Sequence, residues 1–295
     1  MNVSRIALVT GANQGLGRAL VEGLAARLGP DDLVLLTGRD GTRVAEAARE
    51  VGRLATSRAR VEGRVLDVTD TAAVAALAKE LADTHGGVDV VISNAVARVL
   101  PGESQSARAD EFIDVSNTAT HAVLRSFAPV LRPGGRLLVV ASSLGTLGHL
   151  DPRLHPLFDG VDLDRVEAAV ESWRAAVHAG TSEAAGWPRW LNVPSKVAQV
   201  AAVRAVAAER RESDLADGVL LASVCPGMVD TATSRPWFSD FDGAQSPADA
   251  ARAVLDLVLT DRVDPALYGE LVRHGEALPW HAGAPLPEQD RLVTP

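Results

Sequence analysis

Three residue types are scarce in this chain of 295 residues, which has one cysteine, one tyrosine and two lysines. The single cysteine, Cys225, excludes an internal disulfide framework and favours a reducing, cytoplasmic setting. No apolar run approaches the roughly 20 residues that a membrane span needs. The first residues enter a strand pattern directly, with no signal-peptide pattern ahead of them. These absences predict a cytoplasmic protein that does not bind a membrane.

Charge and composition narrow the range of partners. The formal net charge of −9 at pH 7 argues against nucleic acids and anionic membranes as partners. Apolar residues make up 47% of the chain, which is enough to bury the core of one large α/β domain. The preference for arginine over lysine is typical of a high-GC, bacterial genome. We therefore expect a small-molecule partner, and no metal site is predicted.

Short apolar, β-branched runs alternate with alanine-rich amphipathic stretches along the chain. The runs predict strands at Arg5–Thr10, Leu33–Thr37, Arg60–Leu66, Val88–Ser93, Arg136–Ala141, Gly218–Val224 and Leu267–Leu271. The stretches predict helices near Leu16–Arg27, Thr42–Arg53, Thr71–Thr84, Ala109–Leu131, Pro194–Arg211 and Pro247–Leu259. Fully apolar strands between amphipathic helices indicate a parallel sheet covered on both faces. The fold class predicted is therefore α/β, a doubly wound Rossmann-type sheet.

One segment interrupts this alternation. Residues 149–190 carry a charged helical stretch, Asp162–Ala179, between a strand and the next helix, and this insertion could cover a pocket. We expect a single domain over residues 1–275 that contains the insertion. The tail, residues 276–295, is rich in proline and polar residues and is predicted to be irregular, although Trp280 indicates that part of it packs down.

A glycine-rich turn lies between the first strand and the first helix. Gly11, Gly15 and Gly17 allow a tight turn whose backbone approaches a diphosphate at the helix N-terminus. A plain structural turn is the alternative. Arg39 ends the second strand, where an NAD enzyme would have an acid, and its guanidinium suits a 2′-phosphate. The pattern favours NADP(H), while the neighbouring Asp40 and the possibility that Arg39 is a solvated surface residue count against it.

Six motifs occur in a characteristic order. They are TGANQGLG (Thr10–Gly17), LDVTD (Leu66–Asp70), SNAV (Ser93–Val96), ASSLG (Ala141–Gly145), SK (Ser195–Lys196) and CPGMVDT (Cys225–Thr231). Together the motifs resemble the short-chain dehydrogenase/reductase family over roughly the first 230 residues. The insertion followed by GWP, at Gly186–Pro188, resembles the monomeric NADPH-dependent carbonyl reductase branch.

The resemblance implies which residues hold the cofactor. Asp67 would bind the adenine amino group, Lys196 the nicotinamide ribose, and the Pro226–Thr231 segment the nicotinamide amide. Val96 departs from the glycine that the family usually has there. The implied cofactor-binding residues are Gly11, Asn13, Gln14, Gly15, Leu16, Gly17, Arg39, Asp67, Val68, Asn94, Ala95, Lys196, Pro226, Gly227, Val229 and Thr231.

The resemblance also implies four catalytic positions: Asn117, Ser143, Asn192 and Lys196. Ser143 would hydrogen-bond the substrate carbonyl, and Asn117 would help to hold a proton-relaying water chain. Without the family context, Ser143 could simply end a strand and Asn117 could be a polar residue on a helix face.

Asn192 stands where the family has its general acid, a tyrosine one helical turn before the lysine. The only tyrosine, Tyr268, lies far downstream, and asparagine cannot exchange a proton near neutral pH. Loss of a positioned acid costs about 100- to 10,000-fold in rate. Asn192 either polarises an oxyanion or a water in the site, or it caps a helix that has Pro194 in its first turn.

Three functions remain open. In the first, an NADPH-dependent reductase takes its proton from water, Ser143, the substrate, His149 or His178. In the second, the fold catalyses a non-redox cyclisation, isomerisation or elimination in bacterial specialised metabolism. In the third, the chain is a silent nucleotide sensor, which would not need Ser143. The retained nicotinamide contacts favour the reductase.

The insertion is rich in large apolar side chains, namely Leu150, Leu154, Leu157, Phe158, Trp173, Trp187 and Trp190. They could form an apolar wall for a bulky, ring-bearing substrate, or they could anchor the insertion to the body. By resemblance, an insertion at this point hinders the helix packing of the family's tetramers, so we expect a monomer.

Overall fold

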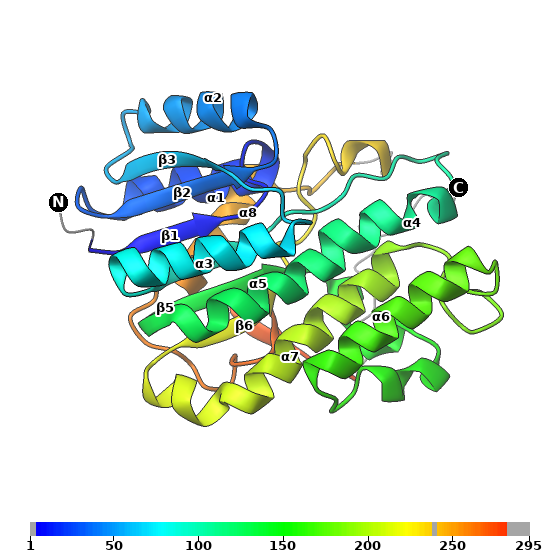
Figure 1. Ribbon diagram of the computed structural model, residues 1–295. Coiled ribbons are helices and arrows are strands. Elements are labelled where there is room, and N and C mark those ends of the chain that lie inside the picture. Colours follow the sequence, from blue (N-terminus) through cyan, green and yellow to red (C-terminus); the bar gives the residue numbers. More distant parts are fainter. Residues whose placement is uncertain (1–3, 238–240, 282–295) are drawn as a thin grey trace.

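The strands that the computed structural model describes, within residues 4–237 and 241–281, form one eight-stranded sheet (Figure 1). Their order across the sheet is β3-β2-β1-β4-β5-β6-β7-β8, and only β8 is antiparallel to its neighbour. The strands are β1 (Ile6–Val9), β2 (Leu33–Gly38), β3 (Arg60–Val65), β4 (Val88–Ser93), β5 (Leu131–Val140), β6 (Leu220–Val224), β7 (Leu271–Arg273) and β8 (Glu276–Leu278). This arrangement confirms the doubly wound α/β fold.

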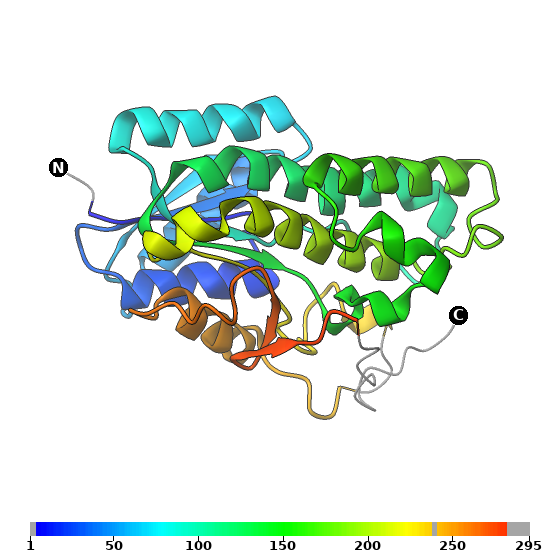
Figure 2. The same ribbon diagram turned by 90° about the horizontal axis from the view of Figure 1, so that it is seen from below.

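Helices cover both faces of the sheet (Figure 2). Helices α1 (Gly15–Arg27), α2 (Gly41–Gly52) and α8 (Pro247–Val258) cover one face. The other face carries α3 (Thr71–His85), α4 (Gln105–Ile113), α5 (Ala119–Phe127) and α7 (Asn192–Ala216), with α6 (Leu163–His178) packed outside against α4 and α7. All four residues of β1 are buried, as expected for a strand between two helical layers.

The chain order reverses beside β1. It builds β1, β2 and β3 outward in one direction and then returns to place β4 on the other side of β1. Parallel strands end at the same edge, so the loops after β1 and β4 meet there. In open α/β sheets this reversal is where ligands bind.

Several elements differ from the sequence prediction at their ends. The helix predicted at Ala109–Leu131 begins earlier, because the Ser104 hydroxyl caps α4, and a π turn (Asp114–Thr118) separates α4 from α5. The last strands were also misplaced: β7 begins at Leu271, and β8 occupies the start of the tail that was predicted to be irregular.

Helix α7 extends beyond its predicted end at Arg211 to Ala216. Its last turns are held by Asp214, which is buried and accepts hydrogen bonds from the Tyr268 hydroxyl at 2.7 Å and from Arg210 at 2.8 Å. The single tyrosine of the chain is therefore a structural donor near β7. It has no place among the residues that the family motifs single out.

Large aromatic side chains fasten the insertion to the body. The rings of Trp173 and Phe158 both pack against Trp187, with centroids 6.1 Å apart in each pair, and all three side chains are buried. Leu150 and Leu154 are buried as well. For these five residues the anchoring role predicted as an alternative is the one that their packing supports.

The described part of the tail docks onto the insertion. Trp280 is buried; its indole N–H donates to Asp159 at 2.9 Å, and its carbonyl accepts from Leu147 N–H at 2.9 Å. The rest of the predicted irregular tail, residues 282–295, lies outside the described residues. Within the described part of the chain, no helix combines the length and hydropathy required to cross a bilayer.

Trp173→Ala is expected to lower the free energy of unfolding by about 3–5 kcal/mol, because it removes a fully buried indole from the insertion's aromatic cluster. Urea denaturation followed by circular dichroism measures this. The matched control is Arg165→Ala, at an exposed position of the same helix. Equal stabilities of the two variants would contradict the anchoring role.

Candidate active site

The turn between β1 and α1 requires glycine. Gly11 and Gly15 have φ angles of +61° and +58°, in the left-handed region that favours glycine. A Cβ on Gly17 would lie 2.5 Å from both Asn94 Nδ2 and the Gly11 carbonyl oxygen. The turn is therefore pressed against the end of β4, and only glycine fits at this contact.

Thr10 and Asn94 tie this turn to β4. Asn94 Nδ2 donates to the carbonyl of Thr10 at 2.9 Å and to that of Gly11 at 3.2 Å. Thr10 Oγ1 accepts from the backbone N–H groups of Asn94 and Ala95, at 2.9 and 3.0 Å. The Asn94 amide thus shapes the turn, and Thr10, which sequence reasoning did not single out, supplies the other half of the contact.

The N-terminus of α1 has backbone N–H donors that no side chain caps. Gln14 occupies the N-cap position but its side chain makes no capping bond, and it accepts instead from Arg43 Nη2 at 2.7 Å. Among the described residues, the backbone N–H groups of Gly15, Leu16 and Gly17 have no side-chain acceptor. These donors and the positive end of the helix dipole are suited to a diphosphate.

Cationic side chains gather beside this helix end. Arg39, after β2, is 68% exposed and forms a long ion pair of 3.8 Å with Glu111. The Asp40 carboxylate next to it caps α2 by accepting from the Arg43 N–H at 3.0 Å. Arg43 is a functional candidate that sequence reasoning missed. The signal was its position one helical turn after Arg39.

The remaining residues predicted for the nucleotide lie at the same edge of the sheet. Asn13 lies beside Gly38 at the end of β2. Asp67, after β3, is exposed and accepts from the Thr69 N–H at 3.0 Å, while Val68 beside it is buried. Val96, at the position where the resemblance led us to expect glycine, is 43% exposed.

The loop after β6 reaches back to the glycine turn. Gly227 has φ of +79°, and Gln245 Nε2 donates to the Pro226 carbonyl at 3.0 Å. Val229 forms a bridge with Gln245 as well. A Cβ on Gly15 would lie 3.7 Å from the Thr231 methyl group, which places the end of this loop against the start of α1. The predicted nicotinamide and diphosphate segments are therefore neighbours.

Ser143 lies in a 3-10 turn (Ser143–Gly145) that follows β5 and packs against α7. A Cβ on Gly145 would lie 2.9 Å from the Lys196 carbonyl oxygen, so the turn touches the helix at the lysine itself. Ser142 Oγ accepts from the Leu144 N–H, whereas Ser143 Oγ has no partner among the described residues. Ser143 is thus the hydroxyl available to a ligand.

Lys196 is held by neutral groups. Its ammonium donates to the Val140 carbonyl at 3.2 Å and to Gln199 Oε1 at 2.8 Å. Burial lowers the pKa of Lys196 to about 8, because removal from water disfavours the charged form. The lysine therefore titrates near physiological pH.

Asn117 lies within the π turn and is completely buried. Its Nδ2 donates to the Ser195 carbonyl at 3.0 Å, and its Oδ1 has no partner among the described residues. This contact joins the π turn to α7 one residue before Lys196. Single-turn π segments are frequently found at functional sites.

Asn192 is the first residue of α7, and the N-cap position belongs to Leu191. The capping role considered for Asn192 is wrong, because Asn192 lies inside the helix, one residue after the N-cap position. The half-buried side chain has no hydrogen-bond partner among the described residues. Its amide is free to contact a ligand one turn before Lys196.

The two histidines considered as proton donors have local partners. His149 Nδ1 lies 3.0 Å from Thr146 Oγ1, and burial lowers the pKa of His149, which keeps it neutral at physiological pH. His178 pairs with Asp110 at 2.9 Å where α6 meets α4. That contact assigns His178 to the packing of the insertion.

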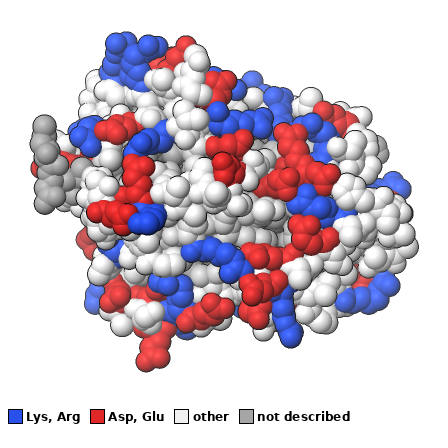
Figure 3. All heavy atoms as spheres, in the orientation of Figure 1, with Lys and Arg blue, Asp and Glu red and all other residues white. Residues whose placement is uncertain are grey.

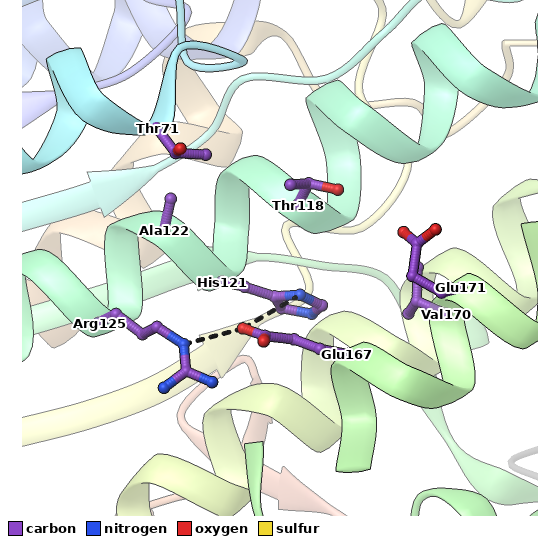
Figure 4. A pocket seen from close by; sticks show the side chains of 8 residues that line it. All are labelled: Thr71, Thr118, His121, Ala122, Arg125, Glu167, Val170 and Glu171. Carbon is purple, nitrogen blue, oxygen red and sulfur yellow. Dashed lines mark hydrogen bonds and ion pairs between the residues drawn. The ribbon is translucent and has the colours of Figure 1, made fainter. Parts of the chain in front are cut away.

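A cavity of about 350 Å³ lies outside this site, between α3, α5 and α6 (Figure 4). It contains none of the predicted site residues. His121 lines it and faces Glu167 at 3.9 Å, but burial lowers the pKa of His121 to about 4, so the imidazole is neutral there. Its other lining residues are Thr71, Thr118, Ala122, Arg125, Val170 and Glu171.

Gly17→Ala is expected to lower the free energy of unfolding by about 1–3 kcal/mol, because the added methyl group overpacks the contact with Asn94. Gly52→Ala is the matched control: nothing lies within 4 Å of its added Cβ, and alanine is expected to stabilise α2 by about 0.5–1 kcal/mol. Urea denaturation measures both. Changes of the same sign and size would contradict the close approach at Gly17.

Comparison with known proteins places this geometry in a family. A protein-family model described as "short chain dehydrogenase" matches residues 5–150. Carbonyl reductase [NADPH] 3 of Mus musculus is 31% identical and that of Rattus norvegicus 30% identical, each alignment covering 94% of this chain and 99% of the relative. Salutaridine reductase of Papaver somniferum shares the fold, with a TM-score of 0.76 at 21% identity over 90% of this chain and 99% of that one. The chain belongs to the short-chain dehydrogenase/reductase family.

Proposed function

We propose that this chain is an NADP(H)-dependent reductase of a carbonyl group on a bulky, ring-bearing small molecule, and that it works without the family's tyrosine. The observation that carries the proposal is the contact between the Ser143 turn and α7 at Lys196, beside the glycine turn's edge of the sheet. The Ser143 hydroxyl, which would bind the substrate carbonyl, and Lys196, which would bind the nicotinamide ribose, therefore lie on segments that touch each other. The relatives that are about 30% identical are named carbonyl reductases with NADPH.

The residues at the first helix fit NADP(H). The N–H donors at the start of α1 suit the diphosphate, and two cations, Arg39 and Arg43, stand beside them for a 2′-phosphate. The adenine-side and nicotinamide-side roles proposed for Asp67 and for the Pro226–Thr231 loop agree with their places at the same edge. When bound, NADPH supplies the hydride.

The carbonyl oxygen would be bound by two neutral donors. Ser143 Oγ and the Asn192 amide both lack partners among the described residues, and each can donate a hydrogen bond to a developing oxyanion. The ammonium of Lys196 adds positive charge one turn away. Ser143 and Asn192 thus stabilise negative charge on the oxygen without giving up a proton themselves.

We assign the proton itself to Lys196, delivered through water. An acid is most effective when its pKa lies near the working pH, and burial brings the pKa of Lys196 to about 8. Because the acid must be protonated, the rate of reduction would be highest below this pKa and would fall as the pH rises through it.

The rim of the site supports a ring-bearing substrate. Trp190, two residues before Asn192, is half-buried, and its ring centroid lies 5.9 Å from that of Trp237. The Trp237 indole N–H donates to the Val99 carbonyl at 2.9 Å, next to the exposed Leu100. Aromatic faces of this kind bind planar rings well. We further propose a monomer, because α6 lies over α4 and α7 on the face where family members commonly pair.

A non-redox reaction is the second candidate, and Asn192 favours it. A site that polarises a carbonyl but lacks a tyrosine suits cyclisation or isomerisation, with Ser143 and Asn192 as hydrogen-bond donors. The two candidates are distinguished by whether the protein oxidises NADPH when a ring-bearing ketone is supplied, because only a reductase consumes the nucleotide.

Arg39→Ala and Arg43→Ala are each expected to weaken NADP⁺ binding about 10- to 100-fold, the effect of losing one charged hydrogen bond to a phosphate. Binding of NAD⁺, which has no 2′-phosphate, should stay nearly constant. Isothermal titration calorimetry measures both, with Arg49→Ala, at another exposed arginine of α2, as the control. Equal weakening of both nucleotides would contradict a phosphate role.

Asn192→Tyr is expected to raise NADPH-dependent reduction of ring-bearing ketones by about 100-fold or more, because it restores a positioned acid one turn before Lys196. Loss of NADPH absorbance across a ketone panel gives the rates of the wild type and the variant. Asn192→Phe, which adds the ring without the hydroxyl, is the control. A folded tyrosine variant no faster than the phenylalanine variant would show that the missing acid does not limit reduction.

A further inference from the structure

Gln199 connects Lys196 to the π turn. The glutamine lies three residues after the lysine on α7 and is 2% exposed. Its Oε1 accepts from the lysine ammonium at 2.8 Å, and its Nε2 donates to the Ser116 carbonyl at 2.7 Å and to Thr120 Oγ1 at 3.2 Å. Both amide hydrogens and the amide oxygen are therefore used, so the side chain has a single orientation.

The π turn supplies the anchor for this amide. The Ser116 carbonyl accepts from Thr120 Oγ1 at 2.8 Å as well as from Gln199, so two side chains bind one backbone oxygen. A π turn departs locally from the regular hydrogen-bond ladder of the helix, which leaves its carbonyls open to such contacts. Asn117 in the same turn binds the Ser195 carbonyl and braces α7 on the other side of the lysine.

Few charged groups face the lysine. Cys225, at the end of β6, is the titratable group that interacts with its charge. Asp114 of the π turn pairs with Arg174 of α6 at 2.6 Å, and His121 of α5 faces Glu167. Neither β5 nor the Ser143 turn contributes a charged side chain next to it. Among the described residues, no carboxylate lies within ion-pair distance of the ammonium.

We propose that Gln199 is a positioning residue of the reaction: its amide, anchored on the π turn, fixes the Lys196 ammonium and does so with a neutral acceptor in place of a carboxylate. A carboxylate at this position would hold the proton on the lysine more tightly. With a side chain at position 199 that has no hydrogen-bond acceptor, Lys196 would release its proton more readily. The identity of residue 199 thus sets the pH at which Lys196 gives up its proton. The proposal rests on the proposed reductase only for the use made of that proton.

The chain has only two lysines, Lys79 and Lys196, so selective ¹³Cε-lysine labelling gives two resonances whose pH titration is read without substrate or nucleotide. We expect Gln199→Glu to raise the Lys196 midpoint by about one pH unit or more. Gln199→Met, of similar size, is expected to lower it. Ala208→Glu places the same added charge at an exposed position of α7 and should leave the midpoint unchanged, with Lys79 as the internal reference.

The proposal is supported if the Lys196 titration midpoint rises in the order Gln199→Met, wild type, Gln199→Glu. If the glutamate variant does not fold, a lowered midpoint in Gln199→Met still supports it. A midpoint that stays at the wild-type value in every folded variant overturns it. In the reductase assay the high-pH fall in rate should move with the midpoint. Shifted midpoints without any NADPH turnover would refute the reductase and leave the role of Gln199 intact, so the two failures are distinguishable.

Discussion

Parallel pairing on both sides of β1 is the constraint on which the rest of the molecule depends. Val9 at the end of β1 pairs with Leu36 of β2 on one side and with Ile92 of β4 on the other. The carboxyl ends of the three strands therefore lie at the same edge of the sheet, and the loops after them meet there. At this edge the glycine turn after β1 packs directly against the loop after β4. This packing explains both the close contact at Gly17 and the hydrogen bonds between Thr10 and the residues after β4.

Helix α7 extends this constraint to the other half of the site. It touches the Ser143 turn at Lys196 and the π turn at Ser195 and Gln199. Buried polar groups are mostly hydrogen-bonded, and here Asn117, Lys196 and Gln199 each donate to a backbone carbonyl of a neighbouring segment. The charges on the visible helical face in Figure 3 are of both signs and intermixed.

The sequence was sufficient to predict strands and helices with a clear apolar periodicity, and turns whose backbone requires glycine. Apolar strands such as Val88–Ser93, and Gly11 and Gly15 with their positive φ angles, depend on local backbone and burial requirements that the sequence shows directly. Contacts between distant elements could not be read in this way. Gln199 donates to the Ser116 carbonyl although the two residues are 83 positions apart in the sequence. The residues around neither of them predict this hydrogen bond. The π turn adds one residue to a helical turn without disturbing the apolar periodicity, and β7 and β8 are too short to produce a pattern.

The central claim is the proposal that this family member moves a hydride with Asn192 at the position where the motif resemblance expects the usual acid. The most direct test is a single-turnover reaction of the wild-type protein with NADPH that carries deuterium at both C4 positions of the nicotinamide, followed by mass spectrometry of the product of a ring-bearing ketone. We predict one deuterium on the carbinol carbon of the alcohol formed. Conversion of the substrate to a product without deuterium, with the nucleotide unchanged, would contradict the reductase and favour non-redox chemistry.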